Sequence, residues 1–367
     1  MLLTKISLVN FRNINQLNLS LDNPLTILYG ENGQGKTNIM ESIYLLSNAS
    51  SFRTSYYREM IQNNMDEAII TGEIDFLKKR DHLKMILKKS GKTAFINDVL
   101  IQKVSDYIGK FNVICFSPED VSLFKDSPSV RRHFLDKELS SLFPVYIKQL
   151  IIFKSVLEER NILLKGNIDL NLLEVIDDKL IESSYDIYKR RKWLISKIEE
   201  FATKIYKKLT NEAQQIKIVY QTFLDEYHQD NYLAKGKEIY KKTLSKDKEK
   251  YYTTVGIHKD DFKVYLNEME IDMYASQGQQ RLISLSMKLA VAEIISKAIK
   301  REPLILLDDA FSEIDTFKKE KLLEYVLKKE QVLITCTDYK NLIHQKQYNK
   351  ITLLHVKEGK IAERSTI

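Results

Sequence analysis

The sequence predicts an α/β fold in which both ends of the chain build one domain and the middle forms a helical insertion. Up to about residue 130, short apolar runs rich in β-branched and aromatic residues alternate with turns, as strands do. The pattern returns after about residue 250, where strands alternate with a helical segment and so indicate a parallel sheet. Between these parts the chain has only two glycines and one proline, so it lacks the turns that separate strands. We therefore expect a discontinuous domain, residues 1–130 and 251–367, and an inserted all-helical domain, residues 131–250.

The composition supports a folded protein with a substantial core. Of the 367 residues, 44% are hydrophobic and 29% are charged, and 11 glycines and 5 prolines are too few for a collagen-like or linker-rich chain. The formal net charge of +7 permits a polyanionic partner, but surplus lysine on an ordinary solvated surface explains it equally well. Charge alone therefore identifies no partner.

The two cysteines, Cys115 and Cys336, each lie within an apolar run, and we expect both to be buried free thiols. Their number excludes a disulfide framework, and they have no metal-ligand spacing. Lys5 and Arg12 interrupt the N-terminus too early for a signal peptide, and no apolar stretch approaches the roughly 18 residues of a membrane span. We expect a soluble protein of a reducing, cytoplasmic compartment.

The middle of the chain carries a helical stripe that repeats every seven residues: Leu173, Leu180, Ile187, Leu194 and Phe201. A helix over about 172–208 would be roughly 55 Å long. The stripe is one-sided, because the positions that would complete a coiled-coil seam are polar: Ser183, Arg190 and Lys197. We expect this long helix to pack against another helix rather than to form a two-chain coiled coil.

The strongest motif is Gly30-Glu31-Asn32-Gly33-Gln34-Gly35-Lys36-Thr37, which fits the phosphate-loop pattern GxxxxGK[ST]. A strand-like run precedes it, and an apolar helical run follows it. Gly33 and Gly35 let the backbone N–H groups turn toward phosphate oxygens, and the following helix adds its positive N-terminus. Lys36 would neutralise the β and γ phosphates, and the Thr37 hydroxyl would bind Mg²⁺. ATP and Mg²⁺ are the expected cofactors.

An acidic strand end near the C-terminus supplies the second half of this site. The segment Pro303-Leu304-Ile305-Leu306-Leu307-Asp308-Asp309 is a continuous apolar run, typical of a buried parallel strand, that ends in two acids. Asp308 is the expected Mg²⁺ ligand, and Asp309 is the candidate that polarises the attacking water. Alternatively, the two acids merely begin a turn. Most of the chain separates them from the phosphate loop, which indicates a domain inserted into the sheet.

A third segment, Tyr274-Ala275-Ser276-Gln277-Gly278-Gln279-Gln280-Arg281, lies directly before a helical run. Ser276 and Gln279 fit a capping box, which alone could account for the segment. Ser and Gly at a helix N-terminus, about 30 residues before the acidic strand end, also fit a second anion-binding site.

Together these segments resemble the ATPase heads of SMC-like ABC proteins, in which a helical arm separates two halves of the nucleotide domain. Residues 276–279 resemble the ABC signature, and Ser312-Glu313-Ile314-Asp315 resembles the D-loop. Within this class the chain resembles the RecF family of bacterial recombination-repair proteins. Five further short motifs carry this resemblance: NFRN (10–13), SFRT (51–54), FSPED (116–120), RRHFLD (131–136) and GIHKDD (256–261).

The resemblance implies an ATP-dependent DNA-binding protein of recombinational repair and replication restart, acting in the DNA damage (SOS) response. In such heads the signature of one subunit covers the γ-phosphate held by the other, so that ATP closes a homodimer. Here the dimer would clamp double-stranded DNA or a gapped junction, mainly through phosphates, and weak ATP hydrolysis would act as the switch that releases it. Implied partners are RecR with RecO, which would help to load RecA on single-strand gaps; no membrane is involved. The implied location is the cytoplasm, in association with the nucleoid.

The resemblance also assigns roles to residues. Arg12 and Asn13 are expected to approach the phosphates or the adenine, although Arg12 could be an ordinary surface residue. His258 would lie near the dimer's nucleotide interface or be structural. Arg53 and the basic run 189–192 are candidate DNA contacts, but four consecutive helical residues cannot share one face, so some of them are only solvated. The expected catalytic residues are Asp309, Asp308 and Lys36, and the expected metal ligands are Thr37 and Asp308. The expected nucleotide-binding residues are Arg12, Asn13, Gly30, Glu31, Asn32, Gly33, Gln34, Gly35, Lys36, Thr37, Asn38, Ser276, Gly278 and Gln279.

The chain departs from common family patterns in a few places. Ile257 and Lys259 stand where the RecF family more often has Pro and Arg. The strand end at 334–338 lacks the His of many ABC proteins, and the sequence leaves open which residue of 335–337 takes its place. Asp309 replaces the usual Glu of ABC heads, as in RecF-like proteins. A shorter acid would hold water less directly, which favours slow hydrolysis.

Three other functions fit less well. A chromosome-structuring SMC-like ATPase needs arms of hundreds of residues and a hinge or metal hook, whereas the middle here has about 120 residues and no cysteine. The nucleotide-binding subunit of a membrane transporter needs a coupling surface and normally a shorter insertion. A nuclease fused to an ABC head, as in OLD-like proteins, needs a separate acidic metal-binding domain, and the sequence shows none.

Overall fold

The computed structural model describes residues 1–77, 79–166, 168–340, 342 and 350–367, and its chain divides into two compact units. Unit 1 comprises Met1–Val121, Phe201–Gln214 and Ser276–Ile367, and unit 2 comprises Ser122–Glu200 and Gln215–Ala275. Both chain ends therefore contribute to unit 1. The units depart from the expected boundaries mainly at 251–275, which lies in unit 2 because its strands pair with a strand at 216–221.

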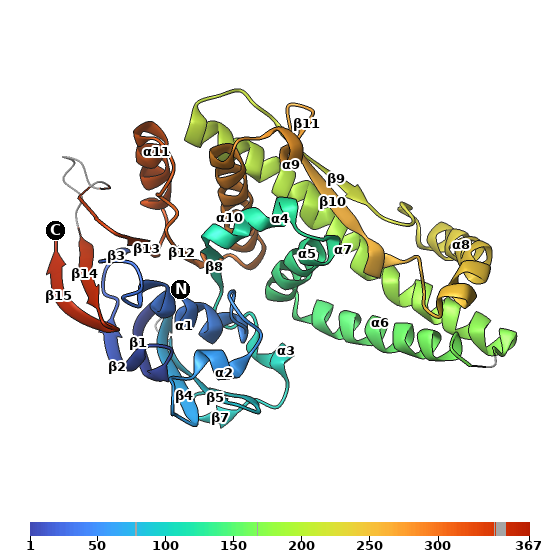
Figure 1. Ribbon diagram of the computed structural model, residues 1–367, viewed down its shortest axis with the longest axis horizontal. Helices are drawn as coiled ribbons and strands as arrows, with labels where there is room; N and C mark the ends of the chain where they lie inside the picture. Colours follow the sequence, from blue (N-terminus) through green and yellow to red (C-terminus); the bar gives the residue numbers. More distant parts are fainter. Residues whose placement is uncertain (78, 167, 341, 343–349) are drawn as a thin grey trace. The chain divides into compact units, whose positions relative to one another are not determined.

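One sheet of unit 1 is six-stranded, in the order β15-β14-β3-β13-β12-β8 (Figure 1). All described neighbours pair in parallel except β14 and β15. The strands are β3 (Leu25–Tyr29), β8 (Val113–Phe116), β12 (Leu304–Leu307), β13 (Val332–Cys336), β14 (Ile351–Lys357) and β15 (Lys360–Thr366). β8, β12 and β13 are buried at every position, which explains their continuous apolar sequences. The carboxyl ends of the parallel strands meet at one edge.

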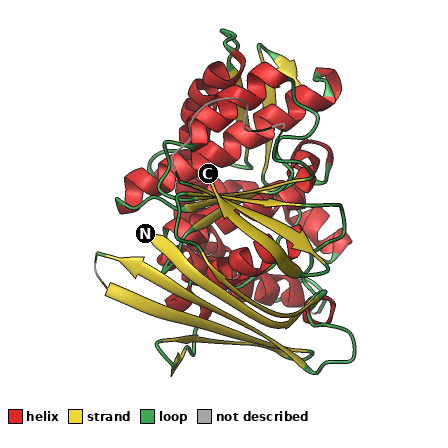
Figure 2. Ribbon diagram, turned by 90° about the vertical axis from the view of Figure 1, so that its left-hand side faces the viewer, coloured by secondary structure: helices red, strands yellow, loops and turns green. Residues whose placement is uncertain are grey.

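The second sheet of unit 1 is antiparallel and follows the order β2-β1-β4-β5-β6-β7. Figure 2 shows the two sheets as separate layers of strands. The strands of this antiparallel sheet are β1 (Leu2–Phe11), β2 (Ile14–Ser20), β4 (Glu67–Phe76), β5 (Lys79–Lys88), β6 (Gly91–Ile96) and β7 (Val99–Leu100). In β4 every second residue is buried over most of the strand, so one face of this sheet packs on the core.

Helix α1 (Lys36–Asn48) links the two sheets of unit 1, because it contacts β1, β4 and β5 of one sheet and β8 and β13 of the other. Its apolar residues join both sheets in one hydrophobic core. The helix that begins at Lys36 of the phosphate loop is therefore anchored in this core. The other helical elements of unit 1 are α2 (Tyr57–Met60), α3 (Val104–Tyr107), the 3₁₀ turn Pro118–Val121, α10 (Gln277–Ile299) and α11 (Thr316–Val326).

Unit 2 contains most of the helical insertion together with a three-stranded antiparallel sheet, β11-β10-β9. The expectation of an all-helical insertion missed this sheet, which is made of β9 (Ile216–Gln221), β10 (Asp261–Leu266) and β11 (Met269–Glu270). The helical elements are α4 (Ser122–Lys125), α5 (Pro128–Leu142), α6 (Pro144–Leu163), α7 (Leu170–Thr210), α8 (Gln229–Lys250), α9 (Ile271–Tyr274) and the 3₁₀ turn Ile257–Lys259.

The long helix predicted over 172–208 is confirmed as α7, which has 41 residues and continues into unit 1. The first four residues of the seven-residue stripe are at most 2% exposed, and Phe201 is half-buried. In unit 2, α7 packs against α6 and α8 of the same chain (Figure 1), as the ion pair Arg160–Asp177 and the contact of Gly236 with Ile181 show.

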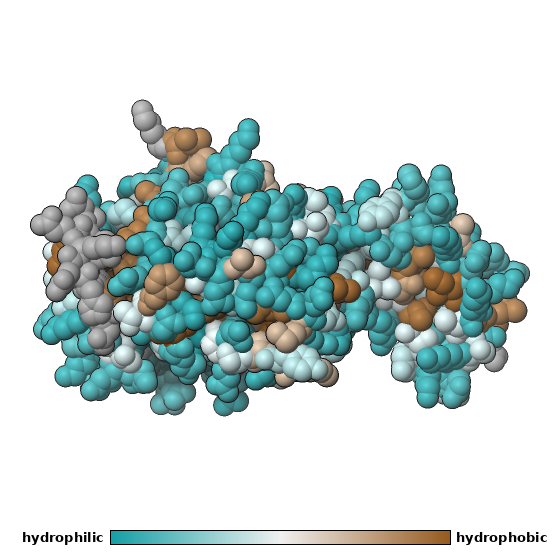
Figure 3. Space-filling view, turned by 90° about the horizontal axis from the view of Figure 1, so that it is seen from above, coloured by the Kyte–Doolittle hydropathy of each residue, from teal (hydrophilic) through white to brown (hydrophobic). Residues whose placement is uncertain are grey.

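The predictions for the cysteines are confirmed, because Cys115 and Cys336 are free and buried. Most side chains on the face in Figure 3 are hydrophilic, with smaller apolar groups between them. Within the described residues, every helix is too short or too polar to cross a membrane.

Candidate nucleotide site

A cavity of about 520 Å³ lies at the carboxyl edge of the parallel sheet, a size typical of small-molecule sites. Loops that follow β3, β8, β12 and β13 bring residues from distant parts of the sequence to it. Its lining comprises Asn13, Asn32, Gly33, Gly35, Lys36, Thr37, Asn38, Arg53, Pro118, Glu119, Asp308, Asp309, Thr335, Cys336 and Thr337. The structure thus brings together the phosphate loop and the acidic strand end.

The phosphate loop has the backbone that its glycines permit. Gly33 has a φ of 80°, and Gly35, the N-cap of α1, has a φ of 111°, both in the region that disfavours side-chain-bearing residues. Gln34 is braced from the turn between β14 and β15, because the backbone N–H of Gly359 donates to its carbonyl (2.8 Å). No side chain caps α1 at Gly35, so the N–H groups of the first turn are left for an anion.

Lys36 is buried inside the loop, where its Nζ donates to the carbonyl oxygens of Gly30 (2.6 Å) and Glu31 (2.7 Å). Burial lowers the pKa of Lys36, whereas the nearby Cys336 and the carboxylates of Asp308 and Asp309 oppose this shift. The ammonium group is therefore already held at the cavity wall, on the side where phosphate oxygens would be received.

Asp308 is the acid that contacts the phosphate loop. Its Oδ1 accepts hydrogen bonds from Thr37 Oγ1 (3.0 Å) and Thr335 Oγ1 (2.7 Å). Burial raises the pKa of Asp308, and these two hydrogen bonds oppose the rise. A hydroxyl and a carboxylate oxygen this close form a hard-oxygen pair that fits Mg²⁺, which keeps several water and phosphate ligands. The described residues hold no cluster of three or more His, Cys, Asp or Glu that could bind a metal unaided.

Asp309 is half-exposed at the cavity and has an unusual backbone, with a φ of 49°. Its N–H donates to Thr335 Oγ1 (2.8 Å), and the Ser312 hydroxyl of the expected D-loop donates to its carboxylate (2.8 Å). Thr335 therefore contacts both acids, and Thr335, Cys336 and Thr337 all line the cavity. The parallel register of β12 and β13, which pairs Leu307 with Ile334, places Thr335 beside them.

Of the two arginines near the loop, Arg53 lines the cavity and Arg12 does not. Arg53 lines the cavity and donates to Asn38 Oδ1 (2.8 Å), and Asn13 lines it as expected. Arg12 instead pairs with Glu41 (2.6 Å) and donates to the carbonyl of Glu59, and it is not among the lining residues. Glu41 is fully buried and also pairs with Arg53 (3.2 Å). Sequence reasoning missed Glu41, although a lone acid on the buried face of the helix after the loop was a signal for it.

The candidate signature segment begins α10. The predicted capping box is confirmed, because Ser276 accepts from the N–H of Gln279 and the side chain of Gln279 accepts from the N–H of Ser276. Ser276 is exposed, and Gly278 and Gln279 are partly exposed. None of the three lines the cavity of its own chain. A role of this turn in binding a phosphate therefore stays a prediction.

The other basic candidates lie in unit 2. His258 is largely buried, its Nε2 donates to the carbonyl of Thr253 (3.0 Å), and burial lowers its pKa to about 4. Of the run 189–192, Arg191 is buried and pairs with Asp136 (2.9 Å) and Asp260 (3.3 Å). Lys192 pairs with Asp225. These four residues do not share one face, as the helical geometry predicts.

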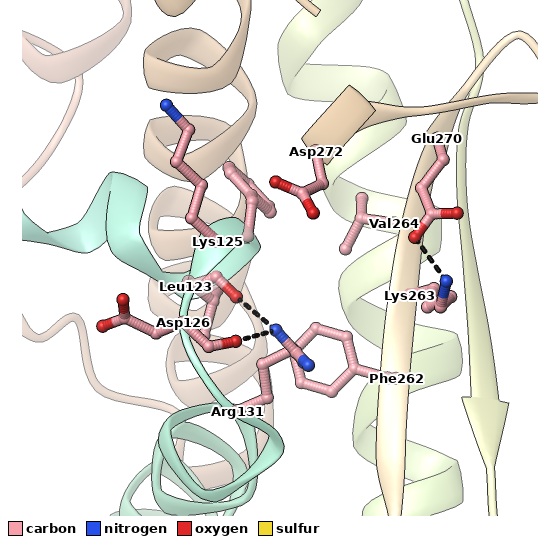
Figure 4. A pocket seen from close by; sticks show the side chains of 10 residues that line it. Leu123, Lys125, Asp126, Arg131, Phe262, Lys263, Val264, Glu270 and Asp272 are labelled. Atoms are coloured by element: carbon pink, nitrogen blue, oxygen red, sulfur yellow. Dashed lines mark hydrogen bonds and ion pairs between the residues drawn. The ribbon is translucent and has the colours of Figure 1, made fainter. Parts of the chain in front are cut away.

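Unit 2 has a smaller cavity, of about 180 Å³, between α4, α5 and β10 (Figure 4). Arg131 donates there to the carbonyl oxygens of Leu123 and Asp126 and pairs with Asp261 (2.6 Å), and Lys263 pairs with Glu270 (2.6 Å). Two of its three lining cations are therefore committed to neighbours within the unit, and it is a weaker candidate than the cavity of unit 1.

Comparisons with known proteins give a consistent result over the whole length. The family model described as RecF/RecN/SMC N terminal domain matches residues 2–360. The chain is 37% identical over 368 residues to the DNA replication and repair protein RecF of Bacillus cytotoxicus and 37% identical over 370 residues to that of Bacillus mycoides. Each match covers 98% of both chains.

Solved structures agree with the sequence matches. A structure of the recombination mediator protein RecF with ATP, described as part of the RecFOR pathway, has a TM-score of 0.87 and 29% identity, and the match covers 100% of this chain and 99% of that one. The Smc head of Pyrococcus furiosus, bound to a domain of ScpA, has a TM-score of 0.57 at 14% identity, with 100% and 96% covered. This second likeness supports the fold alone. The predicted ATPase-head fold is confirmed.

Proposed function

The chain belongs to the RecF family, and from this premise we propose that it is an ATP-dependent DNA-binding protein of recombinational repair and replication restart. Relatives that match over nearly the whole chain are named DNA replication and repair proteins. A recombination mediator protein RecF, matched by structure, is solved with ATP. The SMC-like alternative has only a distant fold likeness in its favour, and unit 2 offers no arm of hundreds of residues.

The cavity of unit 1 supports ATP as the ligand. Lys36 and the uncapped N–H groups at the start of α1 would receive the phosphates. Thr37 and Asp308 would hold Mg²⁺, which supplies positive charge to the phosphate oxygens when it is bound. Asn13, Asn38 and Arg53 lie on the cavity wall and would orient the nucleotide.

The observation that carries the dimer is the position of the signature turn. Ser276, Gly278 and Gln279 form an intact helix start, yet they do not line the cavity of their own chain. An ATP-driven homodimer would place this turn of one subunit against the nucleotide of the other. Closure would then depend on ATP, because the phosphates would be shared between the two subunits.

We further propose that ATP hydrolysis is weak and acts as a switch. Asp309 is the residue that would polarise water. Its side chain is shorter than that of a glutamate, and its carboxylate already accepts a hydrogen bond from Ser312. In this scheme the ATP-bound dimer clamps double-stranded or gapped DNA near the nucleoid, and hydrolysis releases it. RecR, with RecO, would use the clamp to load RecA at single-strand gaps. Contacts to DNA phosphates would make binding strongly salt-dependent.

Sedimentation of the purified full-length protein tests this proposal. We expect ATP with Mg²⁺ to convert the monomer to a dimer, the Asp309→Asn variant to keep the dimer longer, and a gapped duplex to cosediment with it. The Lys36→Ala variant should stay monomeric at every ATP concentration. A native protein that remains monomeric at saturating ATP and ignores the duplex would contradict the proposed function.

A further inference from the structure

Arg281 links the signature turn of α10 to the acidic end of β12. It lies about one turn after Ser276, on the same helix. Its Nη2 donates to the carbonyl oxygen of Asp309 and to Ser312 Oγ (2.7 Å), and its Nη1 donates to Glu313 Oε2 (3.3 Å). Its guanidinium is also 3.7 Å from the Asp309 carboxylate. One side chain from the first turns of α10 therefore contacts both the acid and the D-loop.

The backbone of Asp309 needs such support. A φ of 49° in a residue other than glycine is a strained conformation, which persists where surrounding contacts determine it fully. Thr335 accepts from its N–H, Ser312 donates to its carboxylate, and Arg281 donates to its carbonyl. Of these three supports, Arg281 alone belongs to α10.

The pairing of Arg281 differs from that of a purely structural buried arginine. In unit 2, Arg160 is fully buried and pairs with Asp247, which is also fully buried. Arg281 is 7% exposed, but its acids are 50% and 68% exposed, so its ion pairs hold an exposed loop and not a buried core. This difference favours a role in holding the loop that carries Asp309.

We propose that Arg281 is a positioning residue that couples the signature turn to Asp309 of the same subunit. The inference rests on the proposed function, because the turn is engaged by the nucleotide of the partner subunit. When Ser276 and Gly278 are fixed against that nucleotide, the first turns of α10 are fixed with them, and the guanidinium holds Asp309 in place. Occupation of one nucleotide site then prepares the acid of the other, so the two sites of a dimer hydrolyse ATP in a coupled way.

Variants of Arg281 in the full-length protein test this coupling. We expect Arg281→Ala to form ATP-dependent dimers at ATP concentrations within about threefold of the native protein, while the single-turnover rate falls about 10- to 100-fold. Arg281→Lys should recover part of the rate, because it keeps the charge but not the planar set of donors. Glu293→Gln is the matched control: it removes the pairing of α10 with Lys329, far from Asp309, and should lower Tm without changing the rate.

A double-variant cycle with Ser276→Ala separates coupling from simple damage. If Arg281 acts through the turn, the double variant hydrolyses ATP no more slowly than the slower single variant. Independent effects that multiply would overturn the inference, as would a native rate in Arg281→Ala or a loss of dimerisation in it. If Arg281→Ala does not fold, Arg281→Lys and Arg281→Gln carry the same comparison. A native protein that never dimerises with ATP would instead defeat the proposed function, which keeps the two failures distinct.

Discussion

At the scale of single residues, the chemistry of the site depends on a few long-range contacts. Thr335 donates to Asp308 and accepts from the N–H of Asp309, so one hydroxyl orients both acids. Glu41, fully buried, holds Arg12 away from the cavity and Arg53 beside it. In both cases the position of a side chain depends on a contact with a residue that lies elsewhere in the sequence or beyond a sharp turn of the chain. The residues of the phosphate loop could be predicted individually from the local motif, although Gly359 also braces Gln34.

This difference explains which residues the sequence could identify. Gly33, Gly35, Lys36 and Thr37 follow from local spacing, because the loop and its helix are continuous in the chain. The sequence did not predict that Arg53 lines the cavity, or that Arg12, whose φ is 55°, pairs with Glu41. Local patterns carry no information about such contacts.

His258 gives a prediction for the pH dependence of stability. Burial lowers its pKa from 6.5 to about 4, so between these values the unfolded chain binds more protons than the folded one. The contribution of His258 to stability is therefore complete above pH 6.5 and is lost as the pH falls toward 4. We expect His258→Gln to show a shallower loss of unfolding free energy than the native protein, by at most about 3 kcal/mol over this range.

Chemical denaturation at a series of pH values from 4 to 7 measures this effect. His133→Gln is the control variant, because the side chain of His133 is more exposed than that of His258. An identical acid-induced loss in His258→Gln and in the native protein would show that His258 does not titrate in this way.

At the scale of secondary-structure elements, periodicity predicted the long helix well and the small sheet poorly. The stripe of α7 extends over several turns, so its period is unambiguous. β9 has only six residues. It forms a strand because it pairs with β10, which follows α8 in the sequence. Local periodicity does not reveal pairing over such a distance. The sequence therefore led us to expect an entirely helical insertion.

A matched pair of leucines on α7 tests the role of this stripe. Leu180 is fully buried, and Leu180→Ala should lower the free energy of unfolding by about 2–5 kcal/mol through a cavity and lost apolar contact. Leu172 lies on the same helix but is 48% exposed. Leu172→Ala should change the free energy of unfolding by no more than about 0.5 kcal/mol. Equal effects of the two substitutions, measured by denaturant unfolding, would contradict the assignment of Leu180 to the packed face.

At the scale of the whole molecule, a mainly parallel sheet built from both chain ends creates the candidate nucleotide cavity. The register of β3, β13, β12 and β8 places the phosphate loop, Thr335, Asp308 and the turn at Pro118–Val121 at one edge. Unit 2 is inserted between β8 and β12, whose pairing requires both ends of the chain. The spacing of the two motifs predicted this insertion, whereas its boundaries depended on the pairing of β9 with β10.

The measurement that tests the central claim most directly mixes two inactive variants. Lys36→Ala removes the phosphate contact of a subunit's own cavity, and Ser276→Arg blocks the signature turn that it offers to its partner. If the sites are shared, a mixed dimer contains one intact site, made from Lys36 of one variant and Ser276 of the other. We predict that the mixture retains gapped DNA with ATP and hydrolyses ATP more slowly than the native dimer, because only one site is filled, whereas each variant alone does neither. A mixture as inactive as its components would contradict the shared-site account.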